Sequence, residues 1–135
     1  GAAIADQQLQ DALLTKMRKL SRSRQSDIFN GYGPLSSFSA KIDLAFALEL
    51  IDATTYKRLT AVRQIRNKFA HSADFGLTFD SPEVFAMLRG LPAADCQASD
   101  GQGLYMWHLL QVESHLVSTA GPAILKPSSP QPSRT

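Results

Sequence analysis

Apolar residues recur along most of this chain at intervals of three and four, which is the period of an α-helix. The first such stretch covers about residues 6–22, and its apolar stripe consists of Leu9, Leu13, Met17 and Leu20. No run of four residues alternates apolar and polar positions with β-branched enrichment, so strand signals are nearly absent. The pattern predicts an all-α fold, a single-domain helical bundle of about five helices.

Two further helices are expected in the middle of the chain. Residues 35–51 follow Pro34, which suits a first helical turn because its missing N–H costs nothing there. Apolar residues occupy most sides of this helix, which predicts a buried central element. Residues 53–71 form the next helix, with Asp52 as its N-cap. Its inward face is predicted to be Tyr56, Leu59, Val62, Ile65 and Phe69, and its opposite face is strongly basic.

The remaining segments are shorter or more polar. Residues 22–33 predict a short helical turn or an ordered loop that holds Ile28, Phe29 and Tyr32 in place. A short helix is expected from Pro82 to Arg89, and a last helix over 104–119 turns Leu109, Val112 and Leu116 inward. Residues 126–135 are rich in Pro and Ser, so the chain divides into a helical domain over 1–125 and a tail over 126–135.

Length and composition narrow the class of protein. The chain has 135 residues, which is about one domain. Its apolar runs are only a few residues long, so we expect no membrane span, no secretion signal and a cytoplasmic protein. The single Cys96 builds neither an internal disulfide nor a cysteine-based zinc site. His108 and His115 stand seven apart, too far to share a metal, and are expected at the rim. We predict no metal and no cofactor.

Charge is unevenly distributed along the chain. Residues 1–71 hold eleven Lys and Arg against six Asp and Glu, whereas residues 72–135 hold three against six. The basic residues gather in two acid-free stretches, and such clusters usually form solvated helix faces. Their alternative role is contact with the phosphates of RNA or DNA. The residues assigned to that role are Lys16, Arg18, Lys19, Arg22, Arg63 and Lys68.

The end of the helix over 53–71 combines Arg66, Asn67 and His71. Arginine can hold a phosphate through two bonds, and histidine can move a proton. At about 100° per residue, Arg66 and His71 lie about 140° apart, whereas Asn67 and His71 share one face. They meet on one substrate only if the helix ends there or a second copy faces it, which favours a homodimer. The alternative is structural, with Arg66 capping a carbonyl or paired with Asp43 or Asp74.

Two blocks of the sequence resemble a known family. Residues 33–48 read Gly-Pro-Leu-Ser-Ser-Phe-Ser-Ala-Lys-Ile-Asp-Leu-Ala-Phe-Ala-Leu, and residues 65–71 read Ile-Arg-Asn-Lys-Phe-Ala-His. Together they are similar to the mannitol operon repressor family of small helical bacterial regulators. The group Arg66, Asn67 and His71 also resembles the metal-independent ribonuclease site of the wider group of HEPN domains, which is formed across a dimer of helical bundles.

The two resemblances imply different functions. The family implies a homodimeric transcriptional regulator, and because no helix-turn-helix is recognisable here, we expect it to act through a partner protein rather than by reading DNA. The motif implies the alternative, an endoribonuclease. In that case Arg66 would bind the scissile phosphate, His71 would serve as acid or base at the ribose 2′-hydroxyl, and Asn67 would orient the histidine. We rank the non-enzymatic regulator first.

Overall fold

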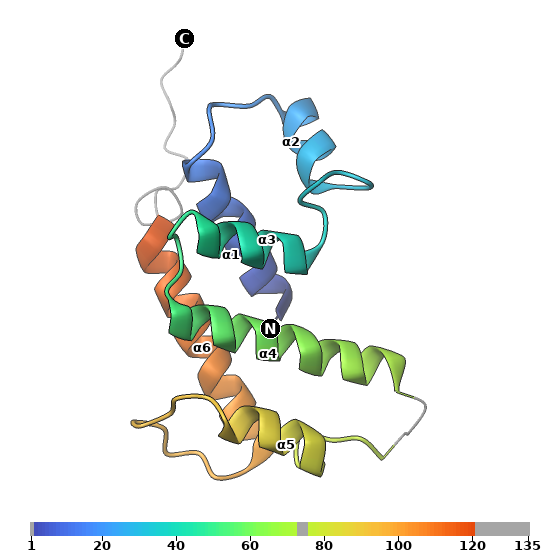
Figure 1. Cartoon of the computed structure of the whole chain (residues 1–135), viewed down its shortest axis with the longest axis vertical. Helices are drawn as coiled ribbons and strands as arrows, with labels where there is room; N and C mark the ends of the chain where they lie inside the picture. The colour runs from blue at the N-terminus through green and yellow to red at the C-terminus, as the bar shows by residue number, and fades with distance from the viewer. Residues whose placement is uncertain (1, 73–75, 121–135) are drawn as a thin grey trace.

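A computed structural model describes residues 2–72 and 76–120 of the chain. The described residues contain six α-helices and no strand, which confirms the all-α prediction. There is one helix more than the five that were predicted. In Figure 1, α1 and α4 pack against α6, α3 packs against α1 and α4, and α5 lies at one end of the bundle. The helices are α1 (Ala2–Thr15), α2 (Arg22–Phe29), α3 (Phe38–Ala47), α4 (Ala53–His71), α5 (Pro82–Arg89) and α6 (Gly101–Ala120).

Most of the apolar core lies where α1, α3, α4 and α6 meet. Each helix contributes one stripe of large side chains with the helical period, and these stripes interlock out of contact with water. The fully buried members include Leu9, Leu13, Ile42, Leu59, Val62, Leu109, Val112 and Leu116. The inward face predicted for the last helix is therefore confirmed.

A second, smaller core holds α5 in place. Ile65 of α4, Val84 and Leu88 of α5 and Leu104 of α6 form one buried cluster. Asp80 accepts a hydrogen bond from the Gly101 N–H at 2.7 Å, which ties the entry to α5 to the start of α6. Any Cβ at position 101 would collide with the Phe79 carbonyl, so this close approach requires glycine. Together these contacts position α5 beside the end of α4.

Side-chain caps begin three of the helices. Asp52 Oδ1 accepts from the Thr55 N–H at 2.7 Å, which confirms the predicted start of α4. The two hydrogen bonds from Thr55 hold the pKa of Asp52 below its ordinary value. Ser37 caps α3 through the Ala40 N–H at 3.0 Å, and Ser21 caps α2. These bonds satisfy amide groups that have no partner inside their own helices.

Several predicted boundaries were wrong. The first helix ends at Thr15 rather than near residue 22. The second begins after Ser37, so Pro34 precedes it instead of occupying its first turn. Residues 22–29 form α2, the helix missing from the expected five, because Ser21 caps it and Phe29 buries its last turn. The predicted tail over 126–135 lies outside the described residues.

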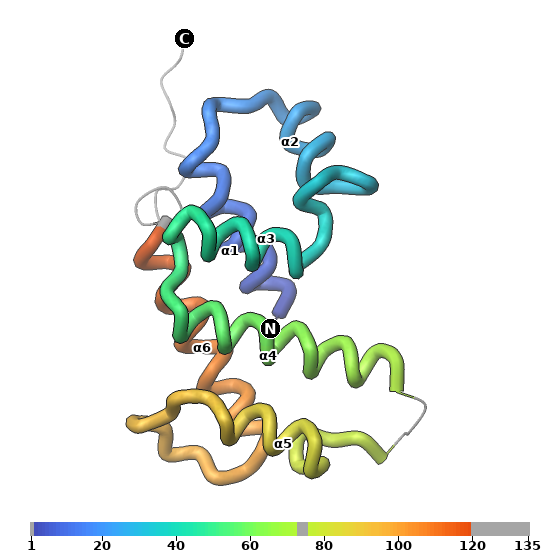
Figure 2. The backbone as a smooth tube through the Cα atoms, in the orientation of Figure 1, coloured from blue at the N-terminus to red at the C-terminus, as the bar shows by residue number. Residues whose placement is uncertain are grey.

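Two expectations about burial were also wrong. The second helix, α3, is not buried on most sides, because Phe46 and Ala47 at its end are exposed. On α4, Phe69 is 36% exposed although the period places it on the inward face. The C-terminal end of α4 extends beyond α3 and α1, as Figure 2 shows. The core that these helices form therefore does not cover Phe69.

A buried charge also lies within the bundle. Lys41 is only 4% exposed, and its Nζ forms an ion pair with Asp6 Oδ1 at 2.9 Å. The pair joins α3 to the first turns of α1, and losing Asp6, whose side chain is 30% exposed, would leave the buried ammonium of Lys41 without its counter-charge. None of the described helices combines the length and the apolar character needed to cross a bilayer.

Candidate functional site: the groove between α4 and α5

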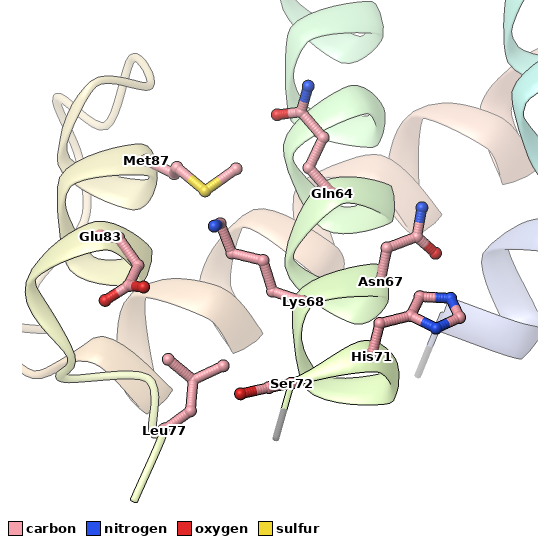
Figure 3. A pocket seen from close by; sticks show the side chains of 8 residues that line it. All are labelled: Gln64, Asn67, Lys68, His71, Ser72, Leu77, Glu83 and Met87. Atoms are coloured by element: carbon pink, nitrogen blue, oxygen red, sulfur yellow. The ribbon is translucent and has the colours of Figure 1, made fainter. Parts of the chain in front are cut away.

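The last turns of α4 are unusually open. Every residue from Arg66 to Ser72 is exposed, whereas five residues of the preceding turns are buried. Asn67 and His71 stand four residues apart and point to the same side of the helix, as the helical spacing predicts (Figure 3). Lys68 extends from the neighbouring side toward α5. An amide, an ammonium and an imidazole are therefore presented together within one helical turn.

These side chains border a groove of about 650 Å³ between α4 and α5. Its walls combine apolar groups, such as Leu77 and Met87, with groups that can form hydrogen bonds or carry charge. Lys68 and Glu83 face the groove from opposite sides (Figure 3). The full lining is Gln64, Asn67, Lys68, His71, Ser72, Leu77, Glu83 and Met87. A concave surface with apolar walls and a few polar groups is typical of binding sites.

Arg66 takes no part in this groove. Its guanidinium lies over the ring of Phe38, 4.9 Å from the centroid, and so connects α4 to the first turn of α3. Because α4 is helical through His71, the predicted divergence of arginine and histidine holds within this chain. The structure thus brings Asn67 and His71 together and places Arg66 elsewhere.

Of the two carboxylates considered as partners for Arg66, only Asp43 lies among the described residues, and its recorded hydrogen bond is to Tyr56, whose hydroxyl donates at 3.4 Å. Asp74 lies outside the described residues. Among the described residues, the contact recorded for the Arg66 guanidinium is the aromatic face of Phe38.

An aromatic series supports the open end of α4. Phe69 meets Phe79 edge to face with 5.0 Å between ring centroids, and Phe79 contacts Tyr105 of α6 at 4.7 Å. Such pairs stabilise by about 0.5 to 1.5 kcal/mol beyond the area that they bury. Burial raises the pKa of Tyr105. These rings hold the segment before α5 against α4 and so help to fix the groove.

The basic residues proposed for phosphate contact fall into two separate regions. Lys16, Arg18 and Lys19 follow α1, and Arg22 begins α2. Arg63 and Lys68 lie on α4, where Arg63 is half-buried and Lys68 lines the groove. The structure therefore does not form one basic surface from the six residues.

The sequence did not predict the polar cluster formed by Arg58, Trp107 and His108. His108, expected at the rim, is completely buried in α6, and its Nδ1 accepts a hydrogen bond from Arg58 Nε at 3.1 Å. Arg58 also donates to the Pro92 carbonyl at 2.9 Å and lies 5.3 Å from the Trp107 ring centroid. A periodicity signal was present, because His108 lies four residues after Leu104 and four before Val112, both of them buried.

This cluster keeps His108 neutral. Burial, together with the positive charge of Arg58, lowers the pKa of His108 to about 4, although the backbone of Leu88 acts in the opposite direction. Burial also lowers the pKa of Arg58. Since Nδ1 accepts from Arg58, the ring proton resides on Nε2. The pair fastens the loop before α6 to α4, which is a structural role.

Metal ligands do not gather in the part of the chain that the structure describes. No three His, Cys, Asp or Glu side chains there come together around a common point. His115 is half-buried near Asp52, seven residues away from His108 on the same helix. Cys96 is a half-buried free thiol.

Comparison with known proteins gives no relative: no protein-family model, no curated protein and no solved structure matches this chain.

Proposed function

We propose that this protein is a non-enzymatic regulator that acts by binding a partner protein in the groove between α4 and α5. The observation that carries the proposal is the groove itself, with Leu77 and Met87 in its walls and hydrogen-bonding groups on exposed turns of α4. Arg66, which the alternative reaction requires, is directed instead toward Phe38. The arrangement favours recognition over catalysis.

The occupant that fits this groove is an amphipathic helix of the partner. Apolar side chains of such a helix would lie between Leu77 and Met87, as in other helix-in-groove interactions. An acidic residue on its flank would meet Lys68, and the amide of Asn67 could pair with polar groups beside it. The groove volume of about 650 Å³ accommodates a few side chains rather than a whole domain.

The proposed role in transcription rests on the resemblance of residues 33–48 and 65–71 to mannitol operon repressors. We propose that the partner belongs to the transcription machinery or to another regulator, and that the chain acts in the cytoplasm of a bacterium. A homodimer is part of the same proposal. Exposed apolar side chains support it, namely Ile4, Phe46, Leu48, Phe69, Met106 and Leu110.

Groove variants in the source cell test the regulatory proposal. A strain lacking the gene would be complemented with the wild type, Met87→Asp or Lys68→Glu, and transcripts would be measured genome-wide. Both variants should reproduce the transcript changes of the deletion. The added carboxylate repels an acidic partner, and removing it from water on binding costs free energy. Gln7→Glu, at an exposed position of α1, is the control and should behave as wild type. Groove variants that restore normal transcripts would overturn the proposal.

The ribonuclease alternative is favoured by one observation. Residues 66–72 are all exposed, so a second copy could approach and bring its own arginine to His71. Incubating the protein with single-stranded and structured RNA in excess chelator decides the matter. Cleavage that disappears in both Arg66→Ala and His71→Ala, with helicity intact, would reverse our ranking.

Sedimentation at micromolar concentration tests the dimer. We expect twice the mass of one chain. A monomer would remove the shared site on which the ribonuclease alternative depends, yet would leave one-to-one binding in the groove possible.

A further inference from the structure

Helix α2 is an ordered helix that contributes little to the core. Of its eight residues only Phe29 is buried, and Arg22, Ser23, Arg24, Ser26 and Asp27 are all exposed. Figures 1 and 2 show it standing off from the bundle formed by the other helices. A short helix rich in serine is marginal by itself, so specific contacts must hold it.

Those contacts are concentrated at its C-terminal end. Phe29 enters the core, and the Leu35 N–H donates to the Ile28 carbonyl at 2.9 Å. Gly33 approaches the carbonyls of Asp27 and Ile28 so closely that a Cβ would collide with both. The end of α2 is therefore fixed, whereas its N-terminal turn projects into solvent with its side chains free to meet a ligand.

The projecting end is strongly basic. No acidic residue occurs between Asp11 and Asp27, a stretch that contains Lys16, Arg18, Lys19, Arg22 and Arg24. All five cations are exposed, and none pairs with a carboxylate in the described ranges. Arg18, Lys19 and Arg24 line a hollow of about 490 Å³ together with Ser21 and one carboxylate, that of Asp27, so the cations outnumber the acid three to one. The N-terminus of α2 opens beside it and adds a partial positive charge.

An aromatic ring lies at the other end of the same helix. Tyr32 is fully exposed, and it occupies the turn between Gly31, at φ 59°, and the closely packed Gly33. No ring or hydrogen-bond contact of Tyr32 occurs among the described residues. Because Tyr32 is fully exposed, it does not contribute to the core. The face of its ring is accessible for stacking on a base.

We propose that α2 and its flanking turns bind single-stranded nucleic acid without sequence preference. Arg18, Lys19 and Arg24 hold consecutive phosphodiesters in the hollow, and Tyr32 stacks on a base further along the strand. A basic track combined with an exposed aromatic ring is the usual composition of such sites, because every base has a face that can stack. The surface is separate from the groove between α4 and α5, so it adds a nucleic-acid contact to a protein-binding regulator.

Binding of a fluorescein-labelled twelve-nucleotide RNA to the full chain, measured by anisotropy in chelator, tests the proposal. Three phosphate contacts predict that log K falls with log salt at a slope of about −2, which is about a twentyfold loss of affinity between 50 and 200 mM salt. The variant Arg18→Gln/Arg24→Gln leaves one contact, so its loss over the same range should be about threefold. Lys57→Gln/Arg89→Gln, with the same net charge, should retain the twentyfold loss.

Tyr32 supplies the second measurement. Tyr32→Ala should weaken RNA binding by fivefold to a hundredfold, whereas Tyr32→Phe should bind as the wild type does, since stacking needs the ring and not the hydroxyl. Circular dichroism verifies that each variant folds. Equal effects of the two double variants, equal binding of duplex DNA, or indifference to Tyr32→Ala would each overturn the proposal. Groove variants such as Met87→Asp should leave RNA binding unchanged, which separates this inference from the proposed function.

Discussion

The two parts of α4 are built differently although they share one continuous helix. In residues 53–65, Thr55, Leu59, Ala61, Val62 and Ile65 are buried against the neighbouring helices. In residues 66–71 every side chain is exposed. The first part therefore supports the fold, whereas the second presents Asn67, Lys68 and His71 where a partner can reach them.

The cause of this difference lies in the neighbours of α4. The first part passes through the core formed with α1, α3 and α6. The second part leaves that core, and its ring contacts are the stacking of Arg66 on Phe38 and the pair of Phe69 with Phe79. The helix continues to His71, but the burial of its side chains ends at Ile65. A surface of this kind can change with little effect on stability, and this is the property to test.

Leu59→Ala should have the largest effect. Leu59 is fully buried, and removing its side chain leaves a cavity, so the free energy of unfolding should fall by about 2 to 5 kcal/mol. Lys68→Ala in the exposed part should change it by less than about 0.5 kcal/mol. Urea denaturation followed by circular dichroism measures both. Similar losses for the two variants would mean that the parts of α4 do not differ as described.

The buried part should also respond to pH through His108, which Arg58 of α4 contacts. The pKa of His108 is about 4 in the folded protein and 6.5 ordinarily, so below pH 6.5 the unfolded chain binds the extra proton first. Stability is therefore fully present above pH 6.5 and is lost as the pH falls toward 4, by on the order of 1 to 3 kcal/mol.

Urea midpoints at pH 7 and pH 5 measure this loss. His108→Gln keeps an acceptor for Arg58 but does not titrate, so its midpoint should change less over the same range. Asp52 acts in a different window, because its lowered pKa makes its contribution fall only below the ordinary value of 3.8. An equal pH dependence in wild type and His108→Gln would assign the loss to other groups.

Sequence reasoning located α4 well because local signals define it. Asp52 caps the predicted first turn, and the period of three and four identifies Leu59, Val62 and Ile65 as buried. The same period failed at Phe69, since periodicity does not reveal where the neighbouring helices end. The groove required the position of α5, which depends on long-range contacts such as the bond from Gly101 to Asp80.

Contacts between distant residues were also beyond a single sequence. Arg58 and His108 are fifty residues apart, and neither carries a local feature that names the other as its partner. The sequence left open whether residues 22–33 form a short helical turn or a loop, and it did not predict the eight-residue helix α2, for a related reason. Its composition favours a turn, and the helix depends on the burial of Phe29 and the close packing of Gly33.

The cap of α4 gives a smaller effect that sharpens the contrast. Asp52→Ala should lower the free energy of unfolding by about 1 kcal/mol, because the Thr55 N–H loses its acceptor. Asp52→Asn should retain most of the stability, since asparagine caps nearly as well. Thermal unfolding of the three proteins side by side measures the difference. A loss in Asp52→Asn as large as in Asp52→Ala would show that the charge, rather than the cap, stabilises this end.

The smallest effect is expected at the other end of the helix, at Asn67 and His71. Both are exposed, and both residue types form helices less readily than alanine, so Asn67→Ala and His71→Ala should each leave the unfolding free energy within about 0.5 kcal/mol, on the stabilising side. Denaturant midpoints of the single variants measure this. A loss of more than 1 kcal/mol would give the two side chains a structural role. An unchanged or increased unfolding free energy would mean that Asn67 and His71 do not stabilise the helix. Binding in the groove would then be the physical reason for an amide and an imidazole at positions where alanine favours the helix more.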